Sequence, residues 1–429
     1  MEFITTLIHQ IVELFAKLQA GGQEAAELFQ AFLKFVGDIL RFLEEHGLSK
    51  PRSDQMFSKT PPMGFNTWNT FGENINEQII KETADKMVEL GLRDCGYEYL
   101  VIDDCWSKRE RDPQTGKIVP DEEKFPNGMK AVSDYVHSKG LKFGMYSCAG
   151  TRTCADYPGS FDHEYLDAET FAEYGVDFLK YDFCYKPDSA NGPLLYRKMG
   201  MALKACGREI LFSACNWGND EVSRWIRSAG AHMYRSTGDI NDSFRSFADI
   251  ALSQVDNLAY SAPGCFNDID MLTVGMYGKG NVGSVGCTDT DYKTQFALWC
   301  MFSSPLMLGG DLRKLNNFCL DLIKNERLIR INQDEESRPA FVATESWNDK
   351  IAFAKLLSND EIALLFVNFS ESKCGVPLYF ENLGITAASG YGLEMTDAFT
   401  GECIGVKKEF MQVHLEAHDC ACYICKLKK

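Results

Sequence analysis

Between residue 63 and about residue 334, short apolar runs alternate with stretches whose apolar residues recur at helical spacing. The apolar runs cover residues 64–68, 99–103, 141–147, 177–182, 210–215, 232–237, about 258–261 and 305–309. The helix-like stretches cover residues 77–90, 129–138, 168–174, 193–205, 221–227, 244–254 and 293–302. Such alternation is typical of a parallel α/β fold. About eight units over roughly 270 residues favour a closed (β/α)8 TIM barrel over a doubly wound sheet.

The pattern changes after Pro339, where short apolar runs are separated by turn residues. These runs cover residues 351–356, 362–366, 376–379, 403–406, 411–415 and 420–427. They predict a C-terminal antiparallel β-sandwich over residues 336–429, following a barrel over residues 63–335. The last run contains Cys420, Cys422 and Cys425. We interpret this cysteine-rich segment as a strand and not as a metal site, because no matching His/Cys group lies nearby.

Residues 1–48 carry two helix-like segments on either side of Gly21 and Gly22. Both have apolar residues at helical spacing, which predicts an amphipathic helical hairpin with a wide apolar face. Such a face has to be buried against the body of the protein or against a copy of itself. We therefore expect a homo-oligomer in which the hairpin takes part; the alternative is that the segment is an addition to the natural chain. Residues 49–62 form the predicted linker.

The charge of the chain restricts its partners. It has 61 acidic and 44 basic residues and a formal net charge of −17. This balance argues against nucleic acid and against an anionic membrane, and it is compatible with a neutral small-molecule substrate. No run is long enough to span a membrane. The N-terminus lacks the basic region of a secretory signal, so we expect a cytoplasmic protein whose 16 cysteines are mostly buried thiols.

Most of the predicted barrel strands end in polar residues. These are Asp103 and Asp104, Tyr146, Lys180 and Asp182, Asn216, Arg235 followed by Asp239, and the run from Asn267 to Asp270. The carboxyl ends of barrel strands converge on one face, where barrel active sites lie. Lys180 and Asp182 stand two apart and share a face of their strand. The cation favours an ionised carboxylate, which a nucleophile requires, although an isolated pair would also fit a structural ion pair.

Three tryptophans, Trp68, Trp106 and Trp217, are interleaved with these carboxylates. Carboxylates accept hydrogen bonds from hydroxyls and indole faces pack on sugar rings, so the combination predicts a carbohydrate site. Two of the carboxylates could catalyse glycoside hydrolysis. Histidine is scarce, with 7 residues, and only His232 lies within one of these strands. We therefore expect no metal and no cofactor.

The same segments resemble glycoside hydrolase family 27, which comprises α-galactosidases and α-N-acetylgalactosaminidases. The resemblance runs from residue 60 to residue 334, fits the β-domain more loosely, and does not cover the N-terminal hairpin. It is carried by GYEYLVIDDCW (96–106), KFGMYS (142–147), TCADYPGS (153–160), GVDFLKYDFC (175–184), RSTGDI (235–240) and NDIDML (267–272). It implies a retaining exo-glycosidase that releases terminal α-linked galactose from galactose-containing oligosaccharides.

The resemblance also implies roles for individual residues. Asp182 matches the nucleophile that forms a covalent glycosyl-enzyme, and Asp239 matches the general acid/base. Asp103 and Asp104 match the pair that holds the sugar 4- and 6-hydroxyls. Lys180 matches the residue that contacts the 3- and 4-hydroxyls.

Five further positions complete the site that the resemblance implies. Arg235 matches the group near the 2-hydroxyl, and Trp68 and Tyr146 match the pocket walls. Cys154 and Met271 are two further predicted substrate-binding positions.

The chain departs from the family at two places. Asn216 stands where α-galactosidases usually carry a Glu that contacts the 2-hydroxyl, so α-N-acetylgalactosaminidase and β-L-arabinopyranosidase activity stay open as alternatives. A catalytically silent galactose-binding protein is a further alternative. Cys154 and Cys184 match a family disulfide, which stays open here, whereas Cys105 lacks the partner that the family pattern would give it.

Overall fold

The computed structural model describes residues 58–344 and 349–429. The hairpin predicted over residues 1–48 and most of the predicted linker lie outside these residues. Eight parallel strands form one sheet in the order β7-β6-β5-β4-β3-β2-β1-β8. They are β1 (Met63–Asn66), β2 (Tyr99–Val101), β3 (Lys142–Cys148), β4 (Phe178–Asp182), β5 (Leu211–Cys215), β6 (Met233–Arg235), β7 (Phe266–Asp268) and β8 (Leu306–Leu308). An isolated parallel bridge between Leu272 and Leu308 joins the ends of the sheet, which closes the predicted barrel.

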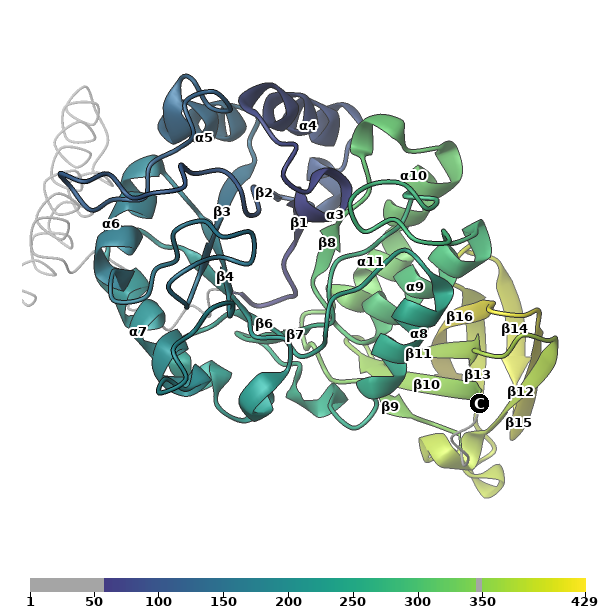
Figure 1. Cartoon of the computed structure of the whole chain (residues 1–429). Helices are drawn as coiled ribbons and strands as arrows, with labels where there is room; N and C mark the ends of the chain where they lie inside the picture. Colours follow the sequence, from purple (N-terminus) through teal and green to yellow (C-terminus); the bar gives the residue numbers. More distant parts are fainter. Residues whose placement is uncertain (1–57, 345–348) are drawn as a thin grey trace, which may run out of the picture. The chain divides into compact units, whose positions relative to one another are not determined.

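The helices lie outside the ring of strands (Figure 1). They are α3 (Trp68–Phe71), α4 (Glu77–Glu89), α5 (Gly128–Ser138), α6 (Glu164–Tyr174), α7 (Gly192–Ala205), α8 (Phe244–Ser253), α9 (Asp289–Met301), α10 (Asn317–Ile323) and α11 (Glu326–Asn332). The helix predicted over residues 221–227 is absent. Two 3-10 turns, η2 (Asn219–Arg224) and η3 (Ile226–Ala229), replace it. The positive φ angles of Asp220 and Glu221, 56° and 52°, interrupt a regular helix there.

The seventh strand lies later in the chain than predicted. Residues Leu258–Tyr260 form a 3-10 turn, η4, and the strand that pairs with β6 is β7. Pro263 and Gly264 separate the two segments. The segment 258–260 is apolar in sequence, as a strand would be, and its Leu258 is buried. In contrast, β7 contains only one apolar residue in three.

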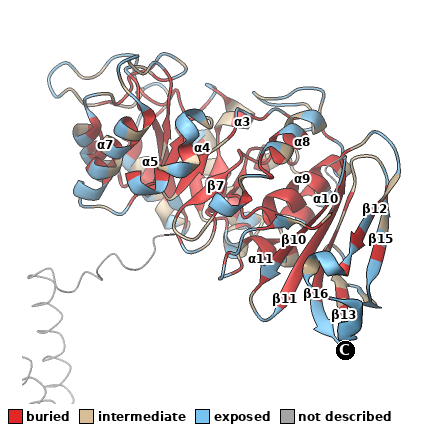
Figure 2. Cartoon of the chain, turned by 90° about the horizontal axis from the view of Figure 1, so that it is seen from below, coloured by how far each residue is buried: buried red, intermediate tan, exposed pale blue. Residues whose placement is uncertain are grey.

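Side chains along the barrel strands alternate between the barrel interior and the helices. One end of the interior is filled by an apolar cluster that includes Tyr99, Val101, Phe178, Leu211, Met233 and Met307. The residues between them, such as Leu100, Leu179, Phe212 and Tyr234, belong to the core under the helices. Figure 2 shows the strands as the buried centre of this unit. Residues two or four positions after the apolar cluster therefore point into the barrel near its carboxyl end.

The C-terminal region is a β-sandwich, as predicted. A six-stranded sheet has the order β14-β13-β16-β11-β10-β9, and β12 and β15 form the second layer. The strands are β9 (Phe341–Val342), β10 (Lys350–Leu357), β11 (Glu361–Asn368), β12 (Cys374–Tyr379), β13 (Gly392–Asp397), β14 (Cys403–Lys407), β15 (Phe410–Leu415) and β16 (Cys420–Lys428). β9 and β13 were not predicted. The segment with Cys420, Cys422 and Cys425 is the strand β16, as expected.

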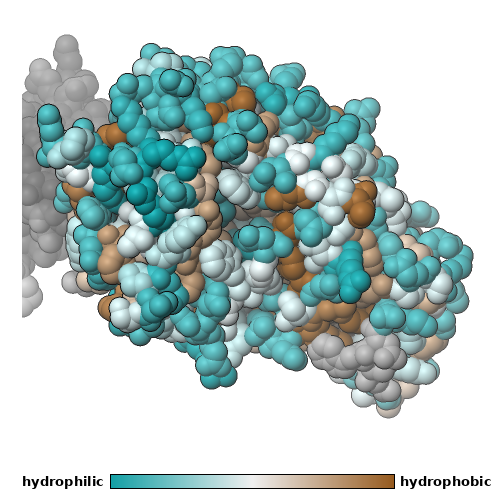
Figure 3. Space-filling view, viewed as in Figure 1, coloured by the Kyte–Doolittle hydropathy of each residue, from teal (hydrophilic) through white to brown (hydrophobic). Residues whose placement is uncertain are grey.

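The central strands β10 and β11 of the six-stranded sheet are buried on both faces. One face belongs to the same core as the barrel, where Phe353 of β10 packs against Phe302 with ring centroids 5.0 Å apart. The other face, with Leu364 and Phe366, packs against β12 and β15. This double burial explains why β11 is apolar almost throughout. No helix in the described ranges, 58–344 and 349–429, is long and apolar enough to cross a membrane, and most of the surface seen in Figure 3 is hydrophilic.

Candidate active site

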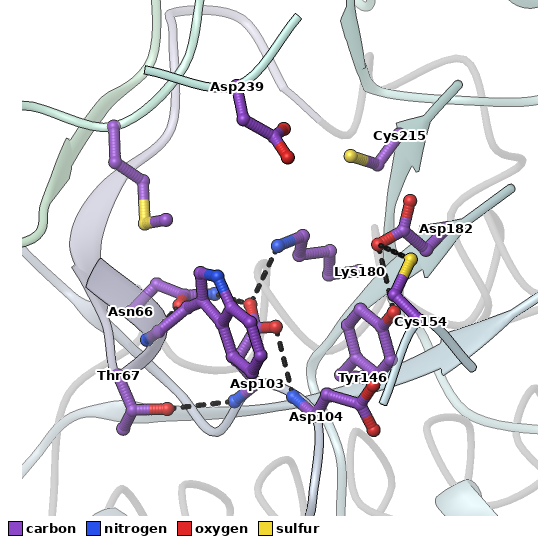
Figure 4. Close-up of polar contacts among 12 residues, drawn as sticks. Asn66, Thr67, Asp103, Asp104, Tyr146, Cys154, Lys180, Asp182, Cys215 and Asp239 are labelled. Carbon is purple, nitrogen blue, oxygen red and sulfur yellow. Dashed lines mark hydrogen bonds and ion pairs between the residues drawn. The ribbon is translucent and has the colours of Figure 1, made fainter. Parts of the chain in front are cut away.

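A cavity of about 520 Å³, including its open mouth, lies at the carboxyl ends of the barrel strands. It is lined by Trp68, Asn69, Asp103, Asp104, Tyr146, Cys154, Lys180, Asp182, Cys215, Arg235, Asp239, Ile240, Asp270, Met271 and Val282. The structure thus brings together every predicted site residue except Asn216 and Cys184. Figure 4 shows Asp182 and Asp239 pointing into this cavity, Asp182 from the end of β4 and Asp239 from the segment that follows β6.

Asp182 is the last residue of β4, and alternation places Phe178, Lys180 and Asp182 on the interior side of that strand. Asp182 is 6% exposed. Its Oδ2 accepts a hydrogen bond from the Tyr146 hydroxyl at 2.8 Å, and its Oδ1 accepts one from the backbone N–H of Phe183 at 2.9 Å. The Asp182 carboxylate is therefore held in one orientation by two donors.

Burial raises the pKa of Asp182 from 3.8 to about 6. The Lys180 ammonium and the Tyr146 hydrogen bond act in the opposite direction, since both favour the charged form. The sequence correctly predicted that Lys180 favours the ionised form of Asp182, but the loss of hydration on burial has a larger effect on the pKa. Asp182 is still largely ionised at neutral pH and becomes protonated in mild acid.

A second group of polar side chains fixes Asp103 and Asp104 at the end of β2. Oδ2 of Asp103 accepts hydrogen bonds from Lys180 Nζ at 2.8 Å and from Asn66 Nδ2 at 2.7 Å. The carboxylate of Asp104 accepts from the backbone N–H groups of Cys105 at 2.7 Å and Ala155 at 3.1 Å. Although these contacts favour its charged form, burial raises the pKa of Asp104. The cavity thus presents two buried carboxylates beside one ammonium.

Asp239 lies at the mouth of the cavity, in the segment between β6 and α8. Its side chain is 75% exposed, and its Oδ1 accepts a hydrogen bond from Arg235 Nη2 at 3.0 Å. Arg235 is itself buried and forms an ion pair with Asp270 at 3.1 Å. The backbone N–H of Ile240 donates to the same Asp270 at 2.7 Å. Asp270 therefore fixes both the arginine that contacts Asp239 and the backbone next to it.

Comparison with known proteins identifies the family. The sequence profile described as Alpha galactosidase A (Melibiase_2) matches residues 60–334 of this chain. The chain belongs to this family of glycoside hydrolases. The α-galactosidase of Cyamopsis tetragonoloba is 38% identical over 388 residues, which cover 90% of this chain and 89% of that protein.

Two further relatives extend this similarity. The α-galactosidase A of Cellvibrio japonicus is 40% identical over 325 residues, covering 73% of this chain and 77% of that protein. The crystal structure of α-galactosidase I from Mortierella vinacea is 30% identical and has a TM-score of 0.79, covering 87% of this chain and 98% of that one. The resemblance to glycoside hydrolase family 27 is thereby confirmed.

The structure of this α-galactosidase-family chain does not place Asn216 in the cavity. Asn216 is 0% exposed, and its Nδ2 donates to the carbonyl of Asn219 at 2.8 Å. The side-chain alternation of β5 explains this. Leu211, Ser213 and Cys215 point to the barrel interior, so the next residue points away from it. The thiol of Cys215, which sequence analysis did not select, lines the wall instead.

Two of the three tryptophans are not sugar platforms. Trp106 is buried, and its Nε1 donates to the backbone carbonyl of Tyr146 at 2.9 Å. Trp217 packs edge-on against Phe183, with ring centroids 6.3 Å apart, and does not line the cavity. Only Trp68 of the three forms part of the cavity wall.

Cys154 and Cys184 form a disulfide, with Cα atoms 5.2 Å apart. Sγ of Cys154 lies 3.7 Å from Oδ2 of Asp182. In residues 58–344 and 349–429, these two cysteines and Asp182 form the one group whose ligand atoms lie close enough to hold a metal ion. Since both sulfur atoms are bonded to each other, they are not available as thiolate ligands.

Sequence analysis did not select four further residues that line the cavity besides Cys215: Asn69, Ile240, Asp270 and Val282. Asp270 had a visible signal, because it belongs to the polar run after β7. Asn69 lies in the short helix α3, and Ile240 and Val282 lie in loops. At these positions neither periodicity nor residue type indicates a cavity wall.

Proposed function

We propose that this chain is a retaining exo-α-galactosidase that removes terminal α-linked galactose from oligosaccharides. The observation that supports this most strongly is the pair of carboxylates in one cavity with different surroundings. Asp182 is buried and held by two hydrogen bonds, whereas Asp239 is exposed at the mouth and held by Arg235. A retaining glycosidase needs one carboxylate fixed for attack and a second at the leaving group.

In the first step, a carboxylate oxygen of Asp182 forms a bond to the anomeric carbon as the bond to the leaving oxygen breaks. Asp239 donates its proton to that oxygen. In the second step, Asp239 removes a proton from a water molecule whose oxygen attacks the anomeric carbon. The ester bond to Asp182 breaks, which restores the carboxylate and gives galactose with retained configuration.

The galactose ring would lie against the buried polar groups at the end of β2. Asp103 and Asp104 accept from sugar hydroxyls, and Lys180 donates to them while remaining paired with Asp103. Asn66 and Lys180 already saturate Oδ2 of Asp103, so its carboxylate is fixed before substrate arrives. Trp68 supplies an apolar wall for the ring.

Rates on three 4-nitrophenyl glycosides test this proposal. We expect the α-galactoside to be hydrolysed faster than the α-N-acetylgalactosaminide and the β-L-arabinopyranoside, with α-galactose as the first product by NMR. A preference for either of the other two would assign the enzyme to that activity. Binding of galactose without hydrolysis of any of them would support a silent sugar-binding protein and overturn the proposal.

We also propose that the chain is a homo-oligomer assembled through residues 1–48. The support is the wide apolar face that the sequence predicts there. Light scattering of the full chain and of a chain that lacks these residues tests this, with galactosidase activity as the control. If both proteins contain the same number of chains per particle, the proposal is contradicted.

A further inference from the structure

A second hollow adjoins the sugar cavity, and Asp239 belongs to both. The hollow is lined by Gly238, Asp239, Asn241, Ser243, Arg245, Ser246, Asp249 and Ile250. Asp239 is the one residue that also lines the sugar cavity. The hollow is open to solvent and has a cavity volume of about 380 Å³, within the range of about 300–1,000 Å³ of ligand pockets. It is therefore large enough for a sugar unit next to the proposed acid/base.

The lining of the hollow is mostly polar and able to form hydrogen bonds. The Arg245 side chain is 91% exposed, and its Nε lies 3.7 Å from Asp249, so the pair is loose and largely solvated. Oδ1 of Asn241 accepts a hydrogen bond from Ser243 Oγ at 2.8 Å, which directs its amide group. A guanidinium, a carboxylate and an amide offer both donors and acceptors to a polyhydroxylated ring.

The segment that forms the hollow is fixed at several points. The Asp242 carboxylate is buried and accepts from the Tyr292 hydroxyl at 3.0 Å and from the N–H of Gly278 at 2.6 Å. Ser243 caps α8, and the ring of Phe244 stacks on His418 of the β-domain with centroids 3.5 Å apart. These contacts within the protein hold the hollow in place beside Asp239, as a preformed subsite requires.

We infer that this hollow binds the leaving group of oligosaccharide substrates, with a hexopyranose ring beside Arg245 and Asn241. The inference rests on the proposed function, in which Asp239 protonates the leaving oxygen. The atoms beyond that oxygen must then lie next to Asp239, outside the cavity that holds the galactose. Arg245 acts as a specificity residue, because its donors distinguish a hydroxylated leaving group from an aryl one.

Two substrates with different leaving groups test this. The ratio of kcat/KM for galactose α-linked to glucose over that for 4-nitrophenyl α-galactoside is measured for the native enzyme, Arg245→Ala and Arg224→Ala. The control, Arg224, is also exposed and paired with an acidic residue on its own turn, but it does not line the hollow. We expect Arg245→Ala to lower the ratio about tenfold, the effect of losing one hydrogen bond from a charged donor, and Arg224→Ala to leave it unchanged.

The glycosyl-enzyme provides a second measurement, because an acceptor sugar enters by the path that a leaving group takes. With 4-nitrophenyl α-galactoside as donor and glucose as acceptor, Arg245→Ala should lower the ratio of transfer to hydrolysis. Unchanged ratios in both experiments would overturn the inference and leave the proposed function intact. Failure of the native enzyme to hydrolyse the nitrophenyl substrate would instead overturn the proposed function.

Discussion

The hydroxyl of Tyr146 and the carboxylate of Asp182 form a hydrogen bond of 2.8 Å at the buried end of the sugar cavity. Tyr146 is fully enclosed and its pKa is raised well above the ordinary value by burial, so it stays protonated and acts as a donor. The same burial raises the pKa of Asp182 to about 6. Tyrosine and burial therefore act on Asp182 in opposite directions, and the pH range of activity depends on their balance.

The decrease of kcat/KM at acidic pH should follow the protonation of Asp182. Attack on the anomeric carbon requires the ionised carboxylate, so kcat/KM for an aryl α-galactoside should fall as the pH drops through about 6. Below this value the loss should approach tenfold for each pH unit. The measurement is kcat/KM from pH 4 to pH 8; a profile that stays flat down to pH 4 would contradict a raised pKa for Asp182.

Replacing Tyr146 by phenylalanine should move this acid limb to higher pH. The hydrogen bond favours the charged form of Asp182, so its removal raises the pKa of the carboxylate further. A hydrogen bond of about 1 kcal/mol corresponds to a displacement of roughly 0.7 pH units. The pH profile of Tyr146→Phe compared with that of the native enzyme measures it. A uniform loss of activity with an unmoved limb would show that Tyr146 acts only as a cavity wall.

Asp182→Asn should abolish turnover and stabilise the fold. The loss should exceed about 10³-fold, because the amide cannot form the glycosyl ester. The pKa of Asp182 is higher folded than unfolded, so ionisation opposes folding, and stability from this group falls as the pH rises through about 4 to 6. A rise from 3.8 to about 6 corresponds to about 3 kcal/mol at pH 7.

Thermal melts of Asp182→Asn and the native enzyme at pH 7 and pH 4 test this sign. The gain in stability should be present at pH 7 and should shrink at pH 4, where the native carboxyl is protonated. A variant that is less stable at pH 7 would contradict the prediction.

The ion pair between Arg111 and Asp167 should contribute more to stability than the surface pairs. Arg111 donates two hydrogen bonds of 2.7 Å to the Asp167 carboxylate, whose side chain is fully buried. Arg111→Met leaves this carboxylate without its partner and should cost about 3–5 kcal/mol. Lys108→Met removes an exposed pair with Glu122 and should cost much less, because solvent screens this pair. Urea unfolding of both variants measures the difference, and equal costs would contradict the prediction.

The sequence predicted the barrel well because most of its strands are apolar runs bounded by polar residues. β7 was misplaced because a strand of three residues, Phe266–Asp268, carries too little pattern to compete with the apolar turn before it. Residue types at strand ends and the family resemblance together predicted the site, and ten of the predicted residues line one cavity.

Asn216 shows why the remaining site residues were harder to predict. Family position suggested a contact with the sugar, but the alternation along β5 turns Cys215 inward and Asn216 outward. The pKa of Asp182 could not be predicted either, because it depends on how completely the folded chain excludes water. Neither the presence of Lys180 nor the spacing of residues in the sequence indicates how far water is excluded from Asp182.

The bridge between Leu272 and Leu308 is the weakest backbone pairing between neighbouring segments of the barrel. Neighbouring strands elsewhere in the ring pair through continuous ladders, whereas this junction is held by a single bridge with hydrogen bonds of 2.8 Å and 2.9 Å. Asp270 and Met271 stand immediately before it and line the sugar cavity. Local opening of the barrel between β7 and β8 would displace Asp270, which is paired with Arg235, while the other strands stay paired. The affinity for galactose should therefore fall with rising temperature before the protein unfolds.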